Sequence, residues 1–155
     1  MLEGDALEFK SVVVSFSADR FRQVLPFLSL RPGWYSNRAQ ATVSSYTSST
    51  GTWDSVASMR TARLALATTT GLDGRIYSLG GTDSQSYFGS AETYDPEIDA
   101  WDAISPMPTA RGWFASAAGL DGRIYAVGGR TNGGDPPPPD PLPTLEVYDP
   151  QTGCW

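Results

Sequence analysis

The chain has 155 residues, of which 40% are hydrophobic, a length and composition that suit one globular domain with a sizeable core. It contains one cysteine and no histidine, which excludes a disulfide framework, Ser-His-Asp and Cys-His catalysis, and every metal site that needs imidazole. The formal net charge is −6 and falls mainly on residues 41–155, so no nucleic acid partner is expected. No apolar run could span a membrane and no secretory signal is visible, so we expect a cytoplasmic protein with no membrane partner.

Residues 1–40 are left unassigned. We expect a strand at Ser11–Phe16, whereas Phe21–Leu30 forms either a strand or a helix. The segment as a whole is either a degenerate copy of the unit that follows it, a capping piece, or sequence foreign to that unit.

From residue 41 onward the chain repeats itself. Trp53–Gly81 aligns with Trp101–Gly129 at an offset of 48 without a gap, and sixteen of the 29 paired positions are identical. Glu92–Pro96 pairs with Glu146–Pro150 at an offset of 54, because six extra residues lie within Arg130–Pro143. A tyrosine precedes a tryptophan by seven residues three times, at Tyr46 and Trp53, Tyr94 and Trp101, and Tyr148 and Trp155. The chain therefore contains two units and the end of another.

Each unit predicts four short β-strands. Asp73-Gly74 and Asp121-Gly122 fit two-residue type I′ turns, which favour Asp-Gly because both central residues need a positive φ. The first two strands are expected at residues 64–71 and 75–79, and again at 113–119 and 123–127. Third strands begin near 91–94 and 145–148, and fourth strands surround Trp101 and, upstream, Trp53. Four strands in a period of about 48 residues are typical of one β-propeller blade.

This pattern resembles the kelch repeat. The matching features are a double glycine after Ile-Tyr-x-Leu/Val, a Tyr-Asp-Pro, and a tryptophan seven residues after that tyrosine, all within residues 41–155. The resemblance implies an all-β fold of kelch-type β-propeller blades, each a four-stranded antiparallel sheet. Residues 41–58 are then the end of a blade, 59–106 a repeat, and 107–155 a truncated repeat. Because propellers typically need about 4–8 blades, we expect an incomplete propeller, a fragment of a longer one rather than a chain that closes by self-association.

Most of the repeated residues are expected to be structural. The double glycines supply close backbone approach and a positive φ, and the recurring aromatic residues pack one blade against the next. These residues are Gly80, Gly81, Gly128, Gly129, Tyr94, Tyr148, Trp53, Trp101 and Trp155. The small residues of the innermost strand fit crowding near the propeller axis, namely Ala65, Ala67, Ala115, Ala117 and Ala118.

Function is expected where the two units differ, or where a repeated polar side chain faces the mouth of the propeller. Arg63 and Arg111 precede the innermost strand, a position that in kelch-like propellers approaches the rim of the central channel. They either clamp a carboxylate or pair with an acid of the neighbouring blade. The residues after the double glycines differ between units and are candidate contacts on the same face: Thr82, Asp83, Arg130 and Asn132.

Two further segments carry open alternatives. Tyr87 and Phe88 are either anchors for a partner or a cover over the edge of a blade. Pro136–Pro139 is either a stiff polyproline II arm that an aromatic groove could recognise or a tolerated surface insertion, and we favour the insertion.

The resemblance favours a kelch-repeat interaction module that binds a protein or peptide through the loops on one propeller face. The alternative is a fragment of a propeller enzyme, similar to a mutarotase or isomerase, acting on a sugar or sugar acid held by Arg63, Arg111 or Arg130. A copper oxidase of the galactose oxidase kind is disfavoured, because that site needs histidine. We therefore expect no catalytic residues, metal or cofactor. Self-association through exposed blade edges is a further expected mode of contact.

Overall fold

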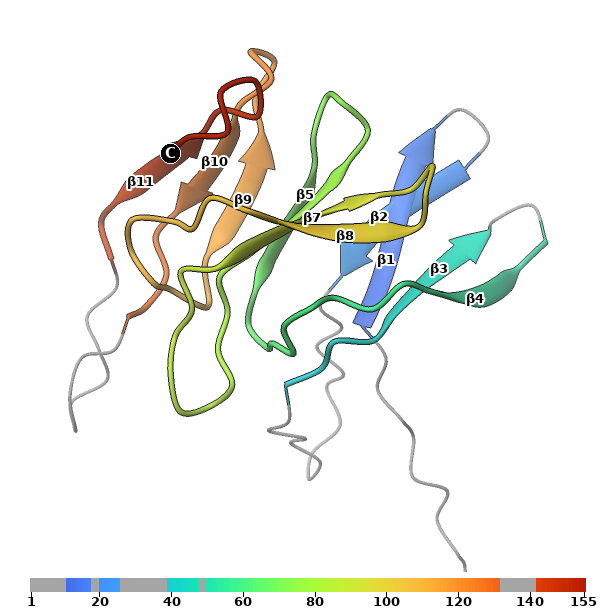
Figure 1. Cartoon of the computed structure of the whole chain (residues 1–155), viewed down its shortest axis with the longest axis horizontal. Helices are drawn as coiled ribbons and strands as arrows, with labels where there is room; N and C mark the ends of the chain where they lie inside the picture. Colours follow the sequence, from blue (N-terminus) through green and yellow to red (C-terminus); the bar gives the residue numbers. More distant parts are fainter. Residues whose placement is uncertain (1–10, 18–19, 26–38, 48–49, 132–141) are drawn as a thin grey trace, which may run out of the picture.

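The computed structural model describes residues 11–17, 20–25, 39–47, 50–131 and 142–155. Within these ranges the chain is all β, without helices, and forms three open sheets (Figure 1). The strands are β1 (Ser11–Ser17), β2 (Arg20–Leu25), β3 (Val43–Thr47), β4 (Thr52–Val56), β5 (Ala67–Thr70), β6 (Ile76–Leu79), β7 (Ala91–Asp95), β8 (Ala100–Ile104), β9 (Ala115–Ala118), β10 (Ile124–Val127) and β11 (Leu145–Tyr148).

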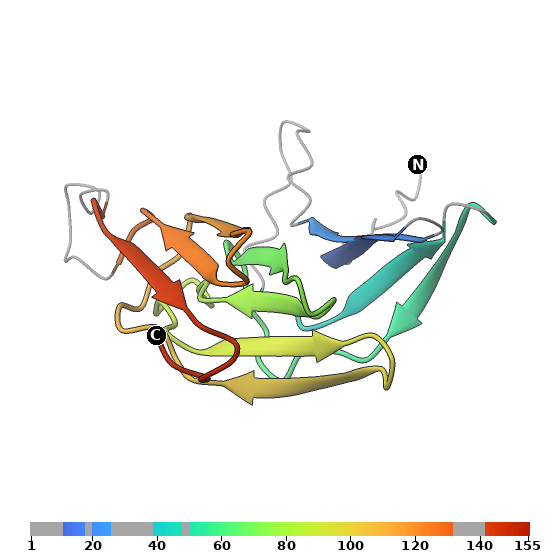
Figure 2. The same cartoon turned by 90° about the horizontal axis from the view of Figure 1, so that it is seen from above.

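The middle sheet is an antiparallel meander in the order β5-β6-β7-β8, which is the predicted blade. The last sheet repeats its first three strands in the order β9-β10-β11. The three sheets lie side by side, and β5 of the middle sheet contacts both β9 and β2 (Figure 2). An incomplete propeller of three adjacent blades is therefore what the chain builds.

The first sheet has a different connectivity. Its order is β2-β1-β3-β4, so β3 and β4 occupy the third and fourth positions of a blade while β2 and β1 occupy the first and second. β1 runs parallel to β3, whereas every other pairing among the described strands is antiparallel. β1 and β2 thus complete a four-stranded sheet. In the middle sheet the first two positions follow chain order, whereas here the later strand, β2, takes the first position and β1 the second.

The turn between the first two strands of each blade differs from the predicted type I′ turn. The amide of Gly74 donates to the carbonyl of Gly71 at 3.1 Å, and the amide of Gly71 donates to the carbonyl of Arg75 at 2.9 Å. In this turn only Gly74 has a positive φ, at 78°. These features define a three-residue loop, a type I turn followed by a glycine bulge, and the second unit repeats it. The two-residue interpretation was wrong because Leu72 also belongs to the loop.

The inner strands are also shorter than predicted. β5 begins at Ala67 rather than Leu64, because Ala65 has a positive φ of 53° that interrupts the extended backbone. Leu64 pairs with Thr82 instead, in an isolated bridge. The same interruption occurs at Trp113 before β9, with a φ of 57°.

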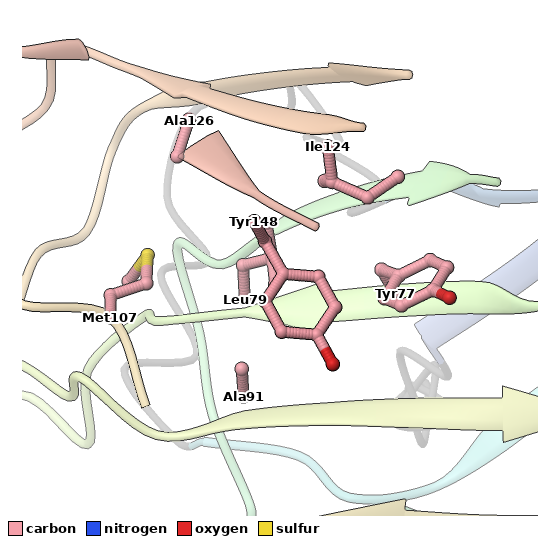
Figure 3. Close-up of a cluster of buried hydrophobic side chains, with 7 residues drawn as sticks. All are labelled: Tyr77, Leu79, Ala91, Met107, Ile124, Ala126 and Tyr148. Carbon is pink, nitrogen blue, oxygen red and sulfur yellow. The ribbon is translucent and has the colours of Figure 1, made fainter. Parts of the chain in front are cut away.

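Hydrophobic clusters fill the two spaces between neighbouring sheets. Between the first and middle sheets, Tyr94 and Trp101 pack with Val43 and Met59, and the Trp101 indole Nε1 donates to the carbonyl of Ala57 at 2.8 Å. The second cluster, between the middle and last sheets, contains Tyr77, Leu79, Ala91, Met107, Ile124, Ala126 and Tyr148 (Figure 3).

The last tryptophan repeats the same contact one sheet further on. Trp155 packs against this second cluster, and its indole Nε1 donates to the carbonyl of Ser105 at 2.7 Å. Trp101 and Trp155 therefore each join their blade to the preceding one, whereas Trp53 is exposed.

The middle and last blades each contain a tyrosine that is hydrogen bonded to the hairpin between their first two strands. The Tyr77 hydroxyl donates to Asp73 Oδ2 at 2.6 Å, and Tyr125 donates to Asp121 Oδ2 at 2.7 Å. Burial of Tyr77, followed by its hydrogen bond to Asp73, raises the pKa of this phenol well above its ordinary value. Tyr77 is buried, whereas Tyr125 is only partly covered, so the pair offers a matched comparison.

We expect the folded state to lose stability at alkaline pH through Tyr77. Because its pKa is higher in the folded than in the unfolded chain, its contribution is fully present below the unfolded value of about 10 and is lost as the pH rises above it. Tyr77→Phe should flatten the fall of the urea midpoint above about pH 10 more than Tyr125→Phe does. An equally steep fall in the wild type and Tyr77→Phe would show that other groups control the alkaline transition.

Candidate functional site

The two units bring their most distinctive residues to one end of the sheets, at which β6 and β10 end. We call this the glycine end and define it as residues 63–66, 80–90, 111–114 and 128–131. It includes the yellow-green loop after β6, which projects below the sheets in Figure 1. The double glycines have positive φ values of 56° and 95° at Gly80 and Gly81, and 69° and 97° at Gly128 and Gly129.

The second glycine of each pair allows two backbone segments to touch. A Cβ atom at Gly81 would lie 2.7 Å from the carbonyl oxygen of Leu64, and one at Gly129 would lie 2.8 Å from that of Gly112. This close approach permits the bridges Leu64 to Thr82 and Gly112 to Arg130. The double glycines therefore have a backbone role.

Arg63 lies inside the middle blade with all five of its guanidinium hydrogens engaged. Nε donates to the carbonyl of Thr61, and Nη1 donates to the carbonyls of Gly80 and Ser90 at 2.6 and 2.9 Å. Nη2 donates to Ser90 Oγ and to Glu92 Oε1, the latter at 2.7 Å. Both side chains of this ion pair are buried, and burial lowers the pKa of Arg63 while Glu92 opposes that shift.

Arg111 forms the same set of contacts in the last blade. Its acceptors are the carbonyls of Thr109, Gly128 and Thr144, the hydroxyl of Thr144, and the carboxylate of Glu146 at 2.7 Å. Each acid also accepts from the backbone beside its arginine, Glu92 from Arg60 and Thr61, and Glu146 from Thr109. We call each arginine with its acid an Arg–Glu staple.

The two staples join strands within a blade instead of facing a ligand. The paired acid comes from the same blade as the arginine, not from the neighbouring one, and neither guanidinium presents an unpaired hydrogen to solvent. This placement accounts for the recurrence of Arg63 and Arg111 without a role in binding.

The remaining predicted residues of this face are placed differently from one another. Thr82 is buried and forms bridges to Leu64 and Tyr87. Asp83 is exposed, but its Oδ1 accepts the amides of Ser86 and Gln85, and these hydrogen bonds lower its pKa. Asn132 and the proline run 136–139 lie outside the described residues.

Arg130 is exposed at the glycine end. Its backbone exchanges two hydrogen bonds with Gly112, which fixes the position of its Cα. Among the arginines whose side chains are described, Arg60, Arg63, Arg75, Arg111 and Arg123 each form an ion pair. Arg130 forms no ion pair with any described acid.

Trp113 is the residue of this end that sequence reasoning missed. It follows Gly112, its side chain is 54% exposed, and its amide donates to the carbonyl of Ala65 in the neighbouring blade at 2.9 Å. Its φ of 57° matches the 53° of Ala65, so this backbone conformation belongs to the repeat and only the side chain differs between the two units. The alignment of the two repeats could have revealed Trp113 as a difference between the units, because its counterpart at the offset of 48 is Ala65.

Phe88 packs on the staple of the middle blade, and Tyr87 packs on Gly112 beside the other staple. The Phe88 ring lies 5.8 Å from Arg63 Cζ, and its backbone exchanges hydrogen bonds with Gly81 and Arg111. The Tyr87 ring packs against Gly112 so closely that a Cβ atom there would lie 3.0 Å from the ring carbons. Both side chains are half-buried, and their contacts favour the interpretation that they cover the edge of the blade.

Two kinds of site find no support in the part of the chain that is described. No group of three or more Cys, Asp or Glu side chains there is arranged to hold a metal ion. No helix there has the length and apolarity needed to cross a membrane.

Comparison with known proteins identifies the class of this fold. The family model of the kelch motif matches residues 63–108 and 114–155, more than half of the chain. The chain therefore belongs to the kelch family and is a partial kelch propeller, and kelch repeats generally mediate protein interactions.

A solved structure supports the fold, and no match is found among curated protein sequences. The structure is that of a fungal alcohol oxidase of the AA5 family in complex with copper, with a TM-score of 0.59 and 23% sequence identity. The match covers 81% of this chain and 25% of the oxidase, so this chain spans about a quarter of that protein's length. At this identity the likeness shows the fold alone.

The close approach at Gly81 predicts a strong response to a single methyl group. Gly81→Ala should lower the free energy of unfolding by clearly more than Gly74→Ala. Both residues have a positive φ, but a Cβ at Gly74 meets nothing within 4 Å, so Gly74→Ala costs only backbone strain of about 1–2 kcal/mol. Urea unfolding followed by circular dichroism measures both values, and equal losses would contradict the tight contact with Leu64.

The staples predict that removing a buried acid lowers the free energy of unfolding far more than removing an exposed one. Glu92→Ala leaves the buried Arg63 charge unpaired and should lower the free energy of unfolding by about 3–5 kcal/mol. Asp102→Ala is the control, because it removes an acid from the largely exposed Arg60–Asp102 pair and should change stability far less. Thermal and urea unfolding compare the two, and similar losses would argue against the staple.

Proposed function

We propose that this chain acts as a kelch interaction module that binds a protein or peptide through the loops of the glycine end. The observation that carries the proposal is the pair formed by Trp113 and Arg130. Both are exposed, they lie on neighbouring backbone segments joined through Gly112, and both replace smaller residues, Ala65 and Thr82, of the other unit. Structural repetition does not require either substitution.

The chemistry of this pair suits a peptide. Tryptophan and arginine are among the residues most enriched at the positions that dominate binding energy at protein interfaces. An exposed indole offers a large apolar surface, and the guanidinium can bind a carboxylate through two parallel hydrogen bonds. We therefore propose that the partner presents an acidic side chain next to an aromatic or aliphatic one.

A binding module is favoured over an enzyme for a sugar acid. That alternative relied on several arginines at the rim, and Arg63 and Arg111 are both buried in staples. Arg130 alone of the three remains to hold a carboxylate. The copper and the alcohol oxidase activity named for the solved relative belong to a protein of which this chain spans about a quarter, and they add no support for catalysis here.

Selection of peptides from a random displayed library tests the proposal. Peptides enriched on the wild-type chain should contain an acidic residue beside an apolar one. Their affinity should fall about tenfold or more in Trp113→Ala and in Arg130→Thr, which restore the residues of the other unit.

Leu120→Ala is the control, because this exposed leucine lies in the hairpin loop at the opposite end of the sheets. Its affinity should equal that of the wild type. Circular dichroism should show that all three variants keep the β fold. Peptides that bind the Trp113 and Arg130 variants as tightly as the wild type would place the binding surface elsewhere.

A further inference from the structure

At the glycine end, the backbones of the middle and last blades are hydrogen bonded to each other. The amide of Gly81 donates to the carbonyl of Arg111 at 2.8 Å, and the amide of Arg111 donates to the carbonyl of Phe88 at 3.1 Å. The amide of Trp113 donates to the carbonyl of Ala65 at 2.9 Å. We call this contact, formed by residues 65, 81, 88 and 111–113, the blade junction. Its hydrogen bonds hold side chains from both blades at fixed places relative to one another.

The two units differ at a further position of the blade junction. Trp113 and Arg130 replace smaller residues of the other unit, and between them Gly112 replaces Leu64 at the offset of 48. The bridge between Gly112 and Arg130 is the counterpart of the bridge between Leu64 and Thr82. At this bridge the last blade therefore lacks one large apolar side chain and gains an indole and a guanidinium.

The missing side chain leaves room for an aromatic ring from the middle blade. A Cβ atom at Gly112 would lie 3.0 Å from both Cδ1 and Cε1 of Tyr87, closer than ordinary van der Waals contact. A leucine there, as at Leu64, would occupy the place of the ring. Gly112 thus brings Tyr87 beside the segment that carries Trp113 and the backbone that pairs with Arg130.

The loop that carries Tyr87 is held in place by its own side chains. Thr82 Oγ1 accepts the amide of Ser84 at 3.0 Å, and Asp83 Oδ1 accepts the amide of Ser86 at 2.8 Å. A backbone bridge joins Thr82 to Tyr87. A binding residue on such a loop is ordered before a partner arrives, which reduces the entropy cost of association.

The polar groups of the three side chains share one chemical property, since all of them can donate hydrogen bonds. Arg130 offers the N–H groups of its guanidinium, Trp113 an indole N–H, and Tyr87 a phenolic O–H. Trp113 and Arg130 are exposed and Tyr87 is half-buried, and none of these side chains forms a hydrogen bond or ion pair with a described residue. A segment that lies across them must therefore offer acceptors at several points.

The conformation of a peptide decides how many acceptors it can offer. In an α-helix all but the last four carbonyls are hydrogen bonded within the helix, so few remain for a binding site. The carbonyls of an extended or polyproline II segment have no partner within the segment. Three donors at the blade junction thus favour an extended partner over a helical one.

We propose that the partner of this module crosses the blade junction as an extended segment, and that Tyr87 is a binding residue beside Trp113 and Arg130. The inference rests on the proposed function and adds a contact residue and the conformation of the partner. Arg130 binds the acidic side chain, and the Tyr87 hydroxyl and the Trp113 indole donate to backbone carbonyls of the segment. Tyr87 then both covers the edge of the blade and contacts the partner.

Variants of the full chain test the role of Tyr87, with a peptide selected from the displayed library as the probe and isothermal titration calorimetry as the measurement. Tyr87→Phe keeps the ring and removes the hydroxyl, so it should raise the dissociation constant about threefold or more. Gly112→Leu restores the residue of the other unit and displaces the ring, so it should raise the dissociation constant about tenfold or more. Gly112→Ala is the milder substitution if circular dichroism shows that Gly112→Leu disturbs the fold.

Tyr125→Phe is the matched control, because the Tyr125 hydroxyl donates to Asp121 in the hairpin at the opposite end of the sheets. This variant loses the same hydroxyl group away from the blade junction and should bind the peptide like the wild type.

Two altered forms of the same peptide test its conformation. A proline placed where alanine has no effect removes an N–H but no carbonyl and disfavours a helix, so affinity should stay within about threefold. A lactam bridge between two side chains four residues apart fixes a helix and should weaken binding about tenfold or more.

The outcomes separate this inference from the proposed function. If Trp113→Ala and Arg130→Thr weaken binding but Tyr87→Phe does not, the role of Tyr87 is overturned and the interaction module stands. Tight binding of the lactam-bridged peptide would likewise overturn the extended partner alone. A peptide that is insensitive to Trp113 and Arg130 would overturn both proposals.

Discussion

The buried pair between Arg63 and Glu92 is the interaction on which the rest of the middle blade depends, and Arg111 with Glu146 takes this place in the last blade. Arg63 precedes the inner strand β5, and its guanidinium binds Gly80 at the end of β6 and Ser90 and Glu92 at the start of β7. These acceptors lie 17, 27 and 29 residues further along the chain. A buried guanidinium must have every hydrogen paired, so its five acceptors fix the geometry of these segments tightly. The carbonyl of Gly80, the first glycine of the pair, is one of these acceptors, so the staple also holds the start of the double glycine.

The staple also separates the residues that must repeat in every unit from those that can differ and serve binding. The arginine and the acid of the staple recur in both units, and both arginines are buried. Neighbouring residues that take no part in the staple differ between the two units. At two of these positions the first unit has Ala65 and Thr82, and the second unit has Trp113 and Arg130. The repeated framework thus holds two unrepeated side chains at fixed places on its surface, which is how a rigid scaffold usually presents a binding site.

Sequence alone predicted the blade but not its internal connections. The third and fourth strands, around Tyr94 and Trp101, lie where their spacing predicted. Asp73-Gly74 misled, because the dipeptide suits both a two-residue and a three-residue loop, and only the hydrogen bond from Gly71 to Arg75 decides between them. The partner of Arg63 lies 29 residues away, and only the parallel recurrence of Glu92 and Glu146 hinted at it. Nothing local predicted that β1 would pair parallel to β3, since such a pairing depends on a strand edge that distant residues provide.

The range of these contacts has a consequence for how the molecule comes apart. Each Arg–Glu staple closes within its own blade, and each indole hydrogen bond from Trp101 or Trp155 reaches only the blade before it. Cohesion is therefore a sum of nearest-neighbour terms, as in a linear array of repeats. Among the three described sheets, the middle one has a neighbour on both sides, so its backbone amides should be better protected against exchange with solvent than those of the other two.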